Sequence, residues 1–261
     1  MESELEFPLD NFMAGLHIVV GTRHESAGGQ TKGRLGVRWL GVVDGHAAIV
    51  KDSDWIENDV ALEGAVPHTG RDLYRESDAW LRGSIIDLNY VHYFRVDKSW
   101  ALGPMLGFRY EEFKYDIYGY SGIHWTTPVS GEGKVLDYRV TSQIPYVGIA
   151  SEGRLSAKHQ LRPALGYSKW ARASDRDDHI LRYKLSEAVC RGEAHLASVG
   201  LDWVFLPQRI LGGSFEYVDI DTTGRQYQGF YGGPSAGNTY VVDDRITSFV
   251  WAGVVRVTYE F

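Results

Sequence analysis

Hydrophobic and polar residues alternate along several stretches of this chain. In the C-terminal segment ITSFVWAGVVRVTYEF, one face of an extended strand carries Phe249, Trp251, Val255, Val257, Tyr259 and Phe261. The opposite face carries Ser248, Arg256, Thr258 and Glu260. A period of two residues is that of a β-strand. The pattern therefore predicts a strand with one apolar face and one polar face.

The same alternation recurs upstream. One face of WALGPMLGFRY carries Trp100, Leu102, Leu106, Phe108 and Tyr110, and one face of HLASVGLDWVF carries Val199, Leu201, Trp203 and Phe205. Over the whole chain the pattern predicts ten strands, near residues 12–24, 34–42, 46–54, 77–97, 99–117, 138–155, 159–174, 181–206, 209–222 and 244–261. Strands of about ten residues with an apolar outer face suit a tilted crossing of a bilayer. An even number of them can close without free edges.

The connections between these strands differ in length. Those near Asp97 and Pro207 are short, whereas SGIHWTTPVSGEGKVLD and TTGRQYQGFYGGPSAGNTYVVDD are long and polar. Short periplasmic turns and long extracellular loops are typical of outer-membrane barrels. No fixed repeat or linker divides the chain. We therefore predict one all-β domain over residues 1–261, an antiparallel up-and-down transmembrane β-barrel of about ten strands.

Composition narrows the possibilities further. The 16 Tyr, 10 Phe, 8 Trp and 30 Gly favour strands and tight turns, and the net charge of −7 argues against a general affinity for nucleic acid. The single cysteine, Cys190, cannot form an intrachain disulfide. The N-terminal MESELEFP lacks the pattern of a signal peptide, and no run approaches the roughly 18 apolar residues of a membrane helix. Alternating strands escape this last test, because their mean hydropathy is low.

Two acidic motifs are the candidates for chemistry: DSDW at residues 52–55 and SDRDDH at residues 174–179. A carboxylate beside an imidazole orients it and stabilises its charged form, so Asp177 and His179 suit proton transfer. Taken singly, each motif also fits a solvated loop, and the D-x-H spacing would also allow two metal ligands. The serines of SGEG and GGPSAG lack the strand–turn–helix context of a nucleophile elbow.

Several segments, taken together and in order, resemble one known family. They are DSDW, DLNYVHYFRVDKSWALGPMLGFRYEEFKY, IPYVGI, GYSKWARASDRDDH and the closing VRVTYEF. The chain resembles the omptins, outer-membrane aspartyl-type endopeptidases built as ten-stranded barrels with the site at the extracellular rim. The resemblance implies a bacterial outer-membrane location with the active site facing the exterior. We expect a monomer surrounded by outer-membrane lipid, because a closed barrel needs no partner.

The resemblance also assigns roles. It implies that Asp52 and Asp54 face Asp177 and His179 across a nucleophilic water, with His179 as base. It implies further that Asp175, together with Glu25 after a two-residue shift in the first strand, binds the basic side chain of the substrate. Peptides and proteins would then be cleaved next to Arg or Lys, between two basic residues. The alternative is a catalytically inactive omptin-like barrel that acts as an adhesin or surface-binding protein.

The chain departs from the family pattern in two places. Only about twenty residues separate Gly33 from Asp52, so a hairpin turning at Asp44-Gly45 would have short arms. The outward positions of the family's lipopolysaccharide motif match Phe108, Tyr110 and Glu112, and its second-strand arginine is replaced by Thr141. Lipopolysaccharide as an activator would then depend on the nearby cations Arg139 and Lys114. We expect no other cofactor and no metal.

Strict alternation conflicts with the proposed site. Leu161, Leu165 and Tyr167 occupy odd positions that read as lipid-facing, and Asp175, Asp177 and His179 are also odd. A site facing the lumen therefore requires a β-bulge, which we predict near Ala171 to Ser174.

Overall fold

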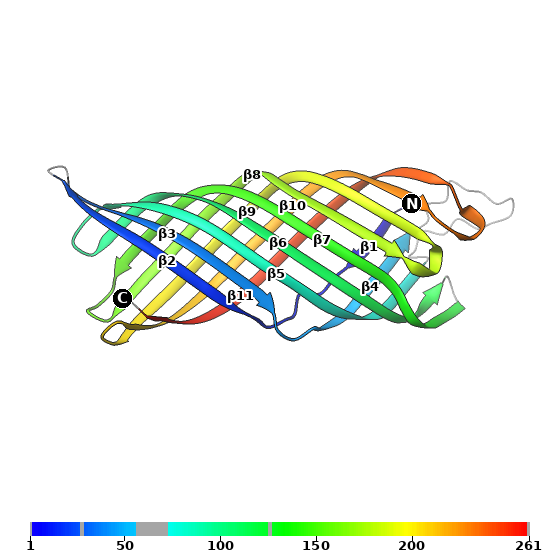
Figure 1. Cartoon of the computed structure of the whole chain (residues 1–261), viewed down its shortest axis with the longest axis horizontal. Coiled ribbons are helices and arrows are strands. Elements are labelled where there is room, and N and C mark those ends of the chain that lie inside the picture. Colours follow the sequence, from blue (N-terminus) through cyan, green and yellow to red (C-terminus); the bar gives the residue numbers. More distant parts are fainter. Residues whose placement is uncertain (1, 27–28, 56–72, 125–126, 260–261) are drawn as a thin grey trace.

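The computed structural model describes residues 2–26, 29–55, 73–124 and 127–259 (Figure 1). Its strands are β1 (Glu2–Glu6), β2 (Met13–Ser26), β3 (Gly29–Val42), β4 (His46–Trp55), β5 (Leu73–Arg95), β6 (Trp100–His124), β7 (Thr127–Arg154), β8 (His159–His179), β9 (Lys184–Leu206), β10 (Arg209–Phe230) and β11 (Thr239–Tyr259). Two short 3₁₀ turns, η1 (Ile180–Arg182) and η2 (Gly233–Ser235), interrupt them. No helix in the described part of the chain is long and apolar enough to cross a membrane.

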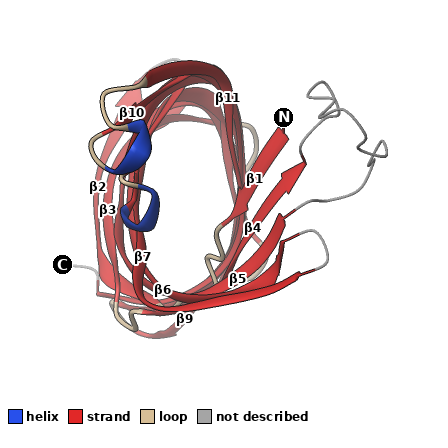
Figure 2. Ribbon diagram, turned by 90° about the vertical axis from the view of Figure 1, so that its right-hand side faces the viewer, coloured by secondary structure: helices blue, strands red, loops and turns tan. Residues whose placement is uncertain are grey.

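All the described strands belong to one antiparallel sheet. From β5 to β11 each strand pairs with the next along the chain, which is up-and-down topology. Seen from the end, the strands curve around a common axis, as Figure 2 shows. The predicted antiparallel barrel is confirmed. The C-terminal Phe261, which contributed to the predicted final strand, lies outside the described residues.

The first four strands form two rows, each made of two short strands placed end to end. β3 pairs with the half of β5 from Ser84 to Phe94, and β4 pairs with the half from Leu73 to Trp80. Both are antiparallel to β5, so they run in the same direction, end to end. The predicted hairpin at Asp44-Gly45 is therefore wrong. The physical reason is length, because two short arms placed in line can pair with most of the 23 residues of β5.

The in-line arrangement also affects closure. β1 pairs with β4 and β2 pairs with β3, so β1 and β2 also lie end to end. Because every pairing from β2 through β3 and β5 to β11 is antiparallel, β2 runs in the same direction as β11. Among the described residues no ladder joins β2 to β11. Each of the ten predicted strands corresponds to one of β2 to β11, and β1 is an addition that sequence patterning missed.

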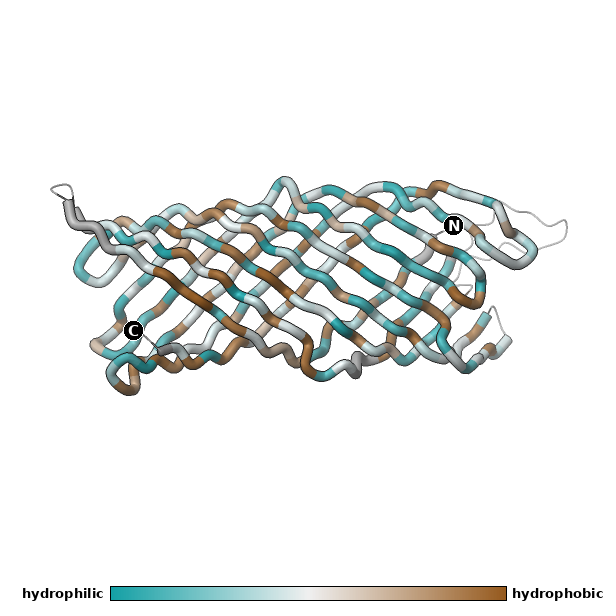
Figure 3. Tube along the Cα trace, viewed as in Figure 1, coloured by the Kyte–Doolittle hydropathy of each residue, from teal (hydrophilic) through white to brown (hydrophobic). Residues whose placement is uncertain are grey.

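Exposed apolar side chains form a belt around the half of the sheet that lies away from the ends of β4 and β8. The belt includes Leu16, Ile18, Leu35, Val37, Leu102, Leu106, Phe108, Val147, Ile149, Leu165, Val199, Leu201, Trp203, Phe215 and Trp251. Beyond the belt many of the outward residues are charged, among them Arg172, Arg176, Glu187, Arg191, Asp243 and Arg245. Figure 3 shows hydrophobic and hydrophilic residues alternating along the strands. Strands of 21 to 28 residues from β5 to β11 exceed the roughly ten that cross a bilayer, so one end projects beyond it.

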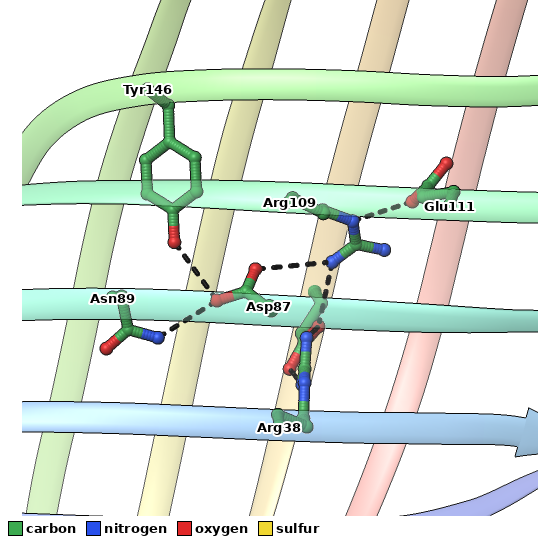
Figure 4. A network of polar contacts seen from close by, with 7 residues as sticks. Arg38, Asp87, Asn89, Arg109, Glu111 and Tyr146 are labelled. Carbon is green, nitrogen blue, oxygen red and sulfur yellow. Dashed lines mark hydrogen bonds and ion pairs between the residues drawn. The ribbon is translucent and has the colours of Figure 1, made fainter.

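Inward-facing side chains fill the interior. An apolar cluster between β4 and β7 includes Val50, Leu81, Phe113 and Tyr138, and Phe7 stacks on the Tyr138 ring at 3.9 Å between centroids. A polar network lies in the half of the barrel that carries the apolar belt (Figure 4). Its members are Arg38 of β3, Asp87 and Asn89 of β5, Arg109 and Glu111 of β6, Tyr146 of β7 and Glu216 of β10. These buried groups are paired with one another, which offsets the cost of removing them from water.

β8 contains the irregularity that the pattern required. Ser168 faces inward on an even position, whereas Ala171 and Ala173 face inward on odd ones, and the β8–β9 register shifts between Ser168 and Ala171. The β7–β8 register shifts over the same region. The predicted bulge is confirmed, slightly nearer the N-terminus than expected. Trp170, within the bulge, is 67% exposed.

Candidate active site

The first acidic motif lies at the end of β4 that projects beyond the apolar belt. Asp52 and Asp54 follow Val50 on the inward face, because alternate residues of a strand share one face. Asp54 is buried, and Asp52 is partly buried. Burial, reinforced by the charge of Asp54, raises the pKa of Asp52 above its usual value. Two carboxylates this close favour retention of a proton on one of them.

The second acidic motif ends β8 at the same end of the barrel. Asp177 is 3% exposed, and its Oδ2 lies 2.8 Å from Nε2 of His179. The bulge upstream places both side chains on the inward face, which strict alternation would have turned outward. The predicted Asp177–His179 couple therefore forms as a direct contact.

The two motifs meet at this end. The charge of His179 acts on the carboxyl of Asp52, and Nη2 of Arg182, in η1, lies 4.0 Å from Oδ2 of Asp54. Lys184, at the start of β9, lies near the acids of both motifs. Burial lowers the pKa of Lys184, and the charge of Asp177 opposes that shift. The structure thus brings together the four residues for which a catalytic role was predicted.

Asp175 lies on the same inward face as Asp177. Burial, and then the charges of Asp244 and Asp177, raise its pKa to about 7. The backbone N–H of Ala188 donates to its Oδ1 at 3.1 Å. Asp244, on β11, is an acid that the sequence reading missed. The alternation along β11 could have found it, because its odd residues face outward and Asp244 is even.

Glu25 does not join this group. It pairs with Gln30 at the end of the β2–β3 ladder, and β3 near Thr31 pairs with β5 near Phe94. That end of β5 is opposite to Leu73, which pairs with Asp54. The prediction that Glu25 lies beside Asp175 is corrected, because the first described strands run with this residue toward the far end of the barrel.

The described residues contain no group of three or more His, Cys, Asp or Glu side chains placed to hold a metal ion. This end of the barrel carries a carboxylate–imidazole couple and a carboxylate pair, with Arg182 and Lys184 close to their acids. Such groups can accept a proton, retain one and hold a polar substrate.

Comparison with known proteins gives the family. The sequence matches the omptin family over residues 31–219, a stretch that contains both acidic motifs. This chain belongs to the omptin family. As an omptin with a barrel fold, it is an outer-membrane protein.

Individual relatives match parts of this omptin. Outer membrane protease OmpP of Escherichia coli (strain K12) is 27% identical over 140 residues, which cover 50% of this chain and 42% of OmpP. The plasminogen activator of Yersinia pestis is 26% identical over 100 residues, covering 37% of this chain and 32% of the activator. These alignments span less than half the length of either relative. The crystal structure of outer membrane protease OmpT from Escherichia coli superposes with a TM-score of 0.74 at 14% identity, covering 99% of this chain and 96% of OmpT, which shows a shared fold.

Proposed function

We propose that this omptin is an outer-membrane endopeptidase that hydrolyses peptide bonds beside basic residues, with its active site facing the exterior. The observation that supports the proposal is the meeting of two acidic motifs, far apart in the sequence, at one end of the barrel. Relatives named as proteases support peptide or protein substrates.

His179 is the proposed base. Its Nε2 faces Asp177, so Nδ1 is the ring nitrogen left to take a proton from water. Asp177 holds that tautomer and stabilises the imidazolium that forms when the water attacks the scissile carbonyl. The water's oxygen forms the new bond to carbon as the carbonyl π electrons move to its oxygen, and the water's proton passes to the ring. When the tetrahedral intermediate collapses, the C–N bond breaks and the imidazolium gives that proton to the leaving amine.

Asp52 and Asp54 form the second half of the proposed site. The raised pKa of Asp52 favours one shared proton between the two carboxyl groups. A protonated carboxyl can donate a hydrogen bond to the oxygen of the scissile carbonyl as negative charge develops there. The ionised partner can hold the attacking water.

Specificity for basic side chains rests on Asp175 and Asp244 in this proposal. Their charges interact at the inward face of β8 and β11. A guanidinium or ammonium group between them would form charge-assisted hydrogen bonds and relieve the repulsion. Asp244 thus takes the place that the sequence reading gave to Glu25.

In this proposal, activating lipopolysaccharide would bind the outer face of the barrel. Glu112 contacts Lys114 at 3.0 Å and Arg139 at 3.1 Å, and Tyr110 donates to it at 2.9 Å. Both cations lie outward beside the apolar belt, where lipid phosphates could compete with Glu112 for them. Thr141 bonds instead to Ser174, at 2.7 Å between the two hydroxyl oxygens.

Cleavage of a fluorogenic Arg-Arg peptide by purified, detergent-refolded protein, with and without lipopolysaccharide, tests the function. We expect turnover that falls by roughly 10³-fold or more in His179→Ala, because the base is removed. His195→Ala on the outward face of β9 is the matched control and should retain activity. Turnover that survives His179→Ala would refute this mechanism. No turnover in either lipid condition would favour the inactive barrel that acts as an adhesin.

A further inference from the structure

Two buried polar atoms beside the Asp177–His179 couple have no hydrogen-bond partner within the described part of the chain. One is Oδ1 of Asp177, the carboxylate oxygen that does not face His179. The other is Oγ of Ser186, a side chain with no exposed surface. An unpaired buried polar group destabilises the folded state, so two such atoms in adjacent strands call for a physical explanation.

The sheet places these two residues directly opposite each other. Asp177 of β8 pairs with Ser186 of β9, and both side chains face inward. Side chains at such paired positions are nearest neighbours, with Cβ atoms about 4.5–5.5 Å apart. On its other side Asp177 pairs with Tyr138 of β7, which is also buried. Asp177 is therefore held in a row across three strands.

The two orphan atoms are chemically complementary. A carboxylate oxygen only accepts hydrogen bonds, and a serine hydroxyl donates one. Rotation of the Ser186 side chain about χ1 moves Oγ relative to Oδ1, and a hydrogen bond between them would satisfy both atoms. We propose that Ser186 is a positioning residue, whose hydroxyl donates to Oδ1 of Asp177 and thereby keeps Oδ2 directed at Nε2 of His179. This inference rests on the proposed function of the couple.

Several charged or titratable groups lie near the couple. They are Asp52 and Asp54 of β4, Tyr138 of β7, Asp175 of β8, Arg182 of η1 and Lys184 of β9. Tyr138 is a neutral phenol whose hydroxyl is hydrogen-bonded to Asp175, and the other neighbours carry charge or lie next to one. Ser186 is the neutral donor that pairs with Asp177 from β9. Ser186 can fix the carboxylate without adding charge to the site.

The test compares Ser186→Ala with Ser186→Thr, which keeps the hydroxyl. We expect kcat for the Arg-Arg peptide to fall about tenfold to a hundredfold in Ser186→Ala, with KM little changed, since the base is misplaced while binding groups remain. Ser186→Thr should recover most of the loss. Ser142→Ala, a buried serine on the inward face of β7, is the matched control and should behave as wild type.

A second readout does not depend on turnover. Nitrogen NMR of ¹⁵N-histidine-labelled protein, with the His179 signals assigned from His179→Ala, reports which ring nitrogen carries the proton. We expect the Nε2–H form in wild type and a mixture of tautomers in Ser186→Ala. Unchanged kcat and an unchanged tautomer in Ser186→Ala would overturn the proposal. A wild type without peptidase activity but with the tautomer change would instead refute the proposed function and leave the positioning role supported.

Discussion

Asp175 illustrates how burial alters the charge of a single side chain. An isolated aspartate on the surface would be ionised throughout the neutral range. Beside Asp244, and largely removed from water, Asp175 has a pKa of about 7. The acid is therefore anionic above that pH and increasingly neutral below it. Its raised value places the affinity of the proposed pocket for basic groups under the control of pH.

The pH dependence of KM tests this at the residue scale. For an Arg-Arg peptide we expect wild-type KM to rise as pH falls through about 7, since protonated Asp175 no longer attracts a cation. Asp175→Asn should raise KM at pH 8 by about tenfold to a hundredfold, the worth of a charge-assisted hydrogen bond, and remove most of the pH dependence.

Asp178→Asn is the matched control for that experiment, because it removes the same charge one residue from Asp177, where Asp178 accepts from the Tyr231 hydroxyl at 2.9 Å. Its KM should stay close to that of wild type. Equal effects of the two substitutions would show that Asp175 acts only through general charge.

At the scale of an element, the β8 bulge determines which way the second motif faces. β8 carries one more residue than β9 between the pairs Ser168–Ala194 and Ala171–Gly192. β8 also carries one more residue than β7 between the pairs Tyr167–Val147 and Arg172–Gln143. The extra residue changes the phase of the alternation, so that odd positions turn from outward to inward.

Two single-residue deletions in β8 distinguish the effect of inverting the inward and outward alternation from the effect of shortening the strand. Deleting Lys169 removes the extra residue and leaves Ser168 and Ala171 on their present faces, so we expect a folded protein with activity within a few-fold of wild type. Deleting Arg172, after the bulge, should turn Asp175, Asp177 and His179 outward and abolish cleavage. Peptide cleavage by both refolded variants is the measurement. Similar activity in the two would contradict this account of the bulge.

At the scale of the whole molecule, ion pairs across the interior connect strands that are distant in the sheet. Arg38 of β3 donates from Nη2 to Oε2 of Glu216 on β10 at 2.9 Å. Arg109 of β6 lies 4.0 Å from the same carboxylate and donates to Glu111 at 2.6 Å. The network joins β3 and β6 to β10 across the interior, in the half of the barrel that carries the apolar belt. We expect it to hold the strand ends in the relative positions that the site requires.

Removal of one partner tests the importance of that network. Glu216→Gln leaves the buried cations Arg38 and Arg109 poorly compensated, so we expect a loss of roughly 3–5 kcal/mol in the free energy of unfolding. Glu187→Gln is the control, since Glu187 and Arg176 are both 60% exposed and 3.8 Å apart. It should change stability by less than about 0.5 kcal/mol. Urea unfolding of the refolded protein is the measurement, and equal losses would contradict the structural role.

Much of the fold could be predicted from the pattern of residues, because a period of two is local. The outward positions of Leu102, Leu106 and Phe108, and the need for a bulge before Asp175, follow from counting along one strand. The in-line order of β3 and β4 could not be predicted so. It depends on how much of β5 each arm covers, which is a property of pairing between distant segments.

The candidate site divides in the same way. Asp52, Asp54, Asp177 and His179 could be named from two motifs, since each motif lies on one strand end. The inward face of Asp244 could be read from the alternation along β11, but its closeness to Asp175, and the position of Ser186 opposite Asp177, could not be predicted without the arrangement of β8, β9 and β11.

The sequence by itself determined the segments that form β2 to β11, which face of each is apolar, and which acids and histidine are available for chemistry. Tertiary structure alone decided which of those groups lie at the same end of the barrel and which side chain stands opposite which. The reason is physical: alternation fixes the face of a residue within its own strand, whereas its height and its neighbours depend on hydrogen-bond register with strands far away in the chain.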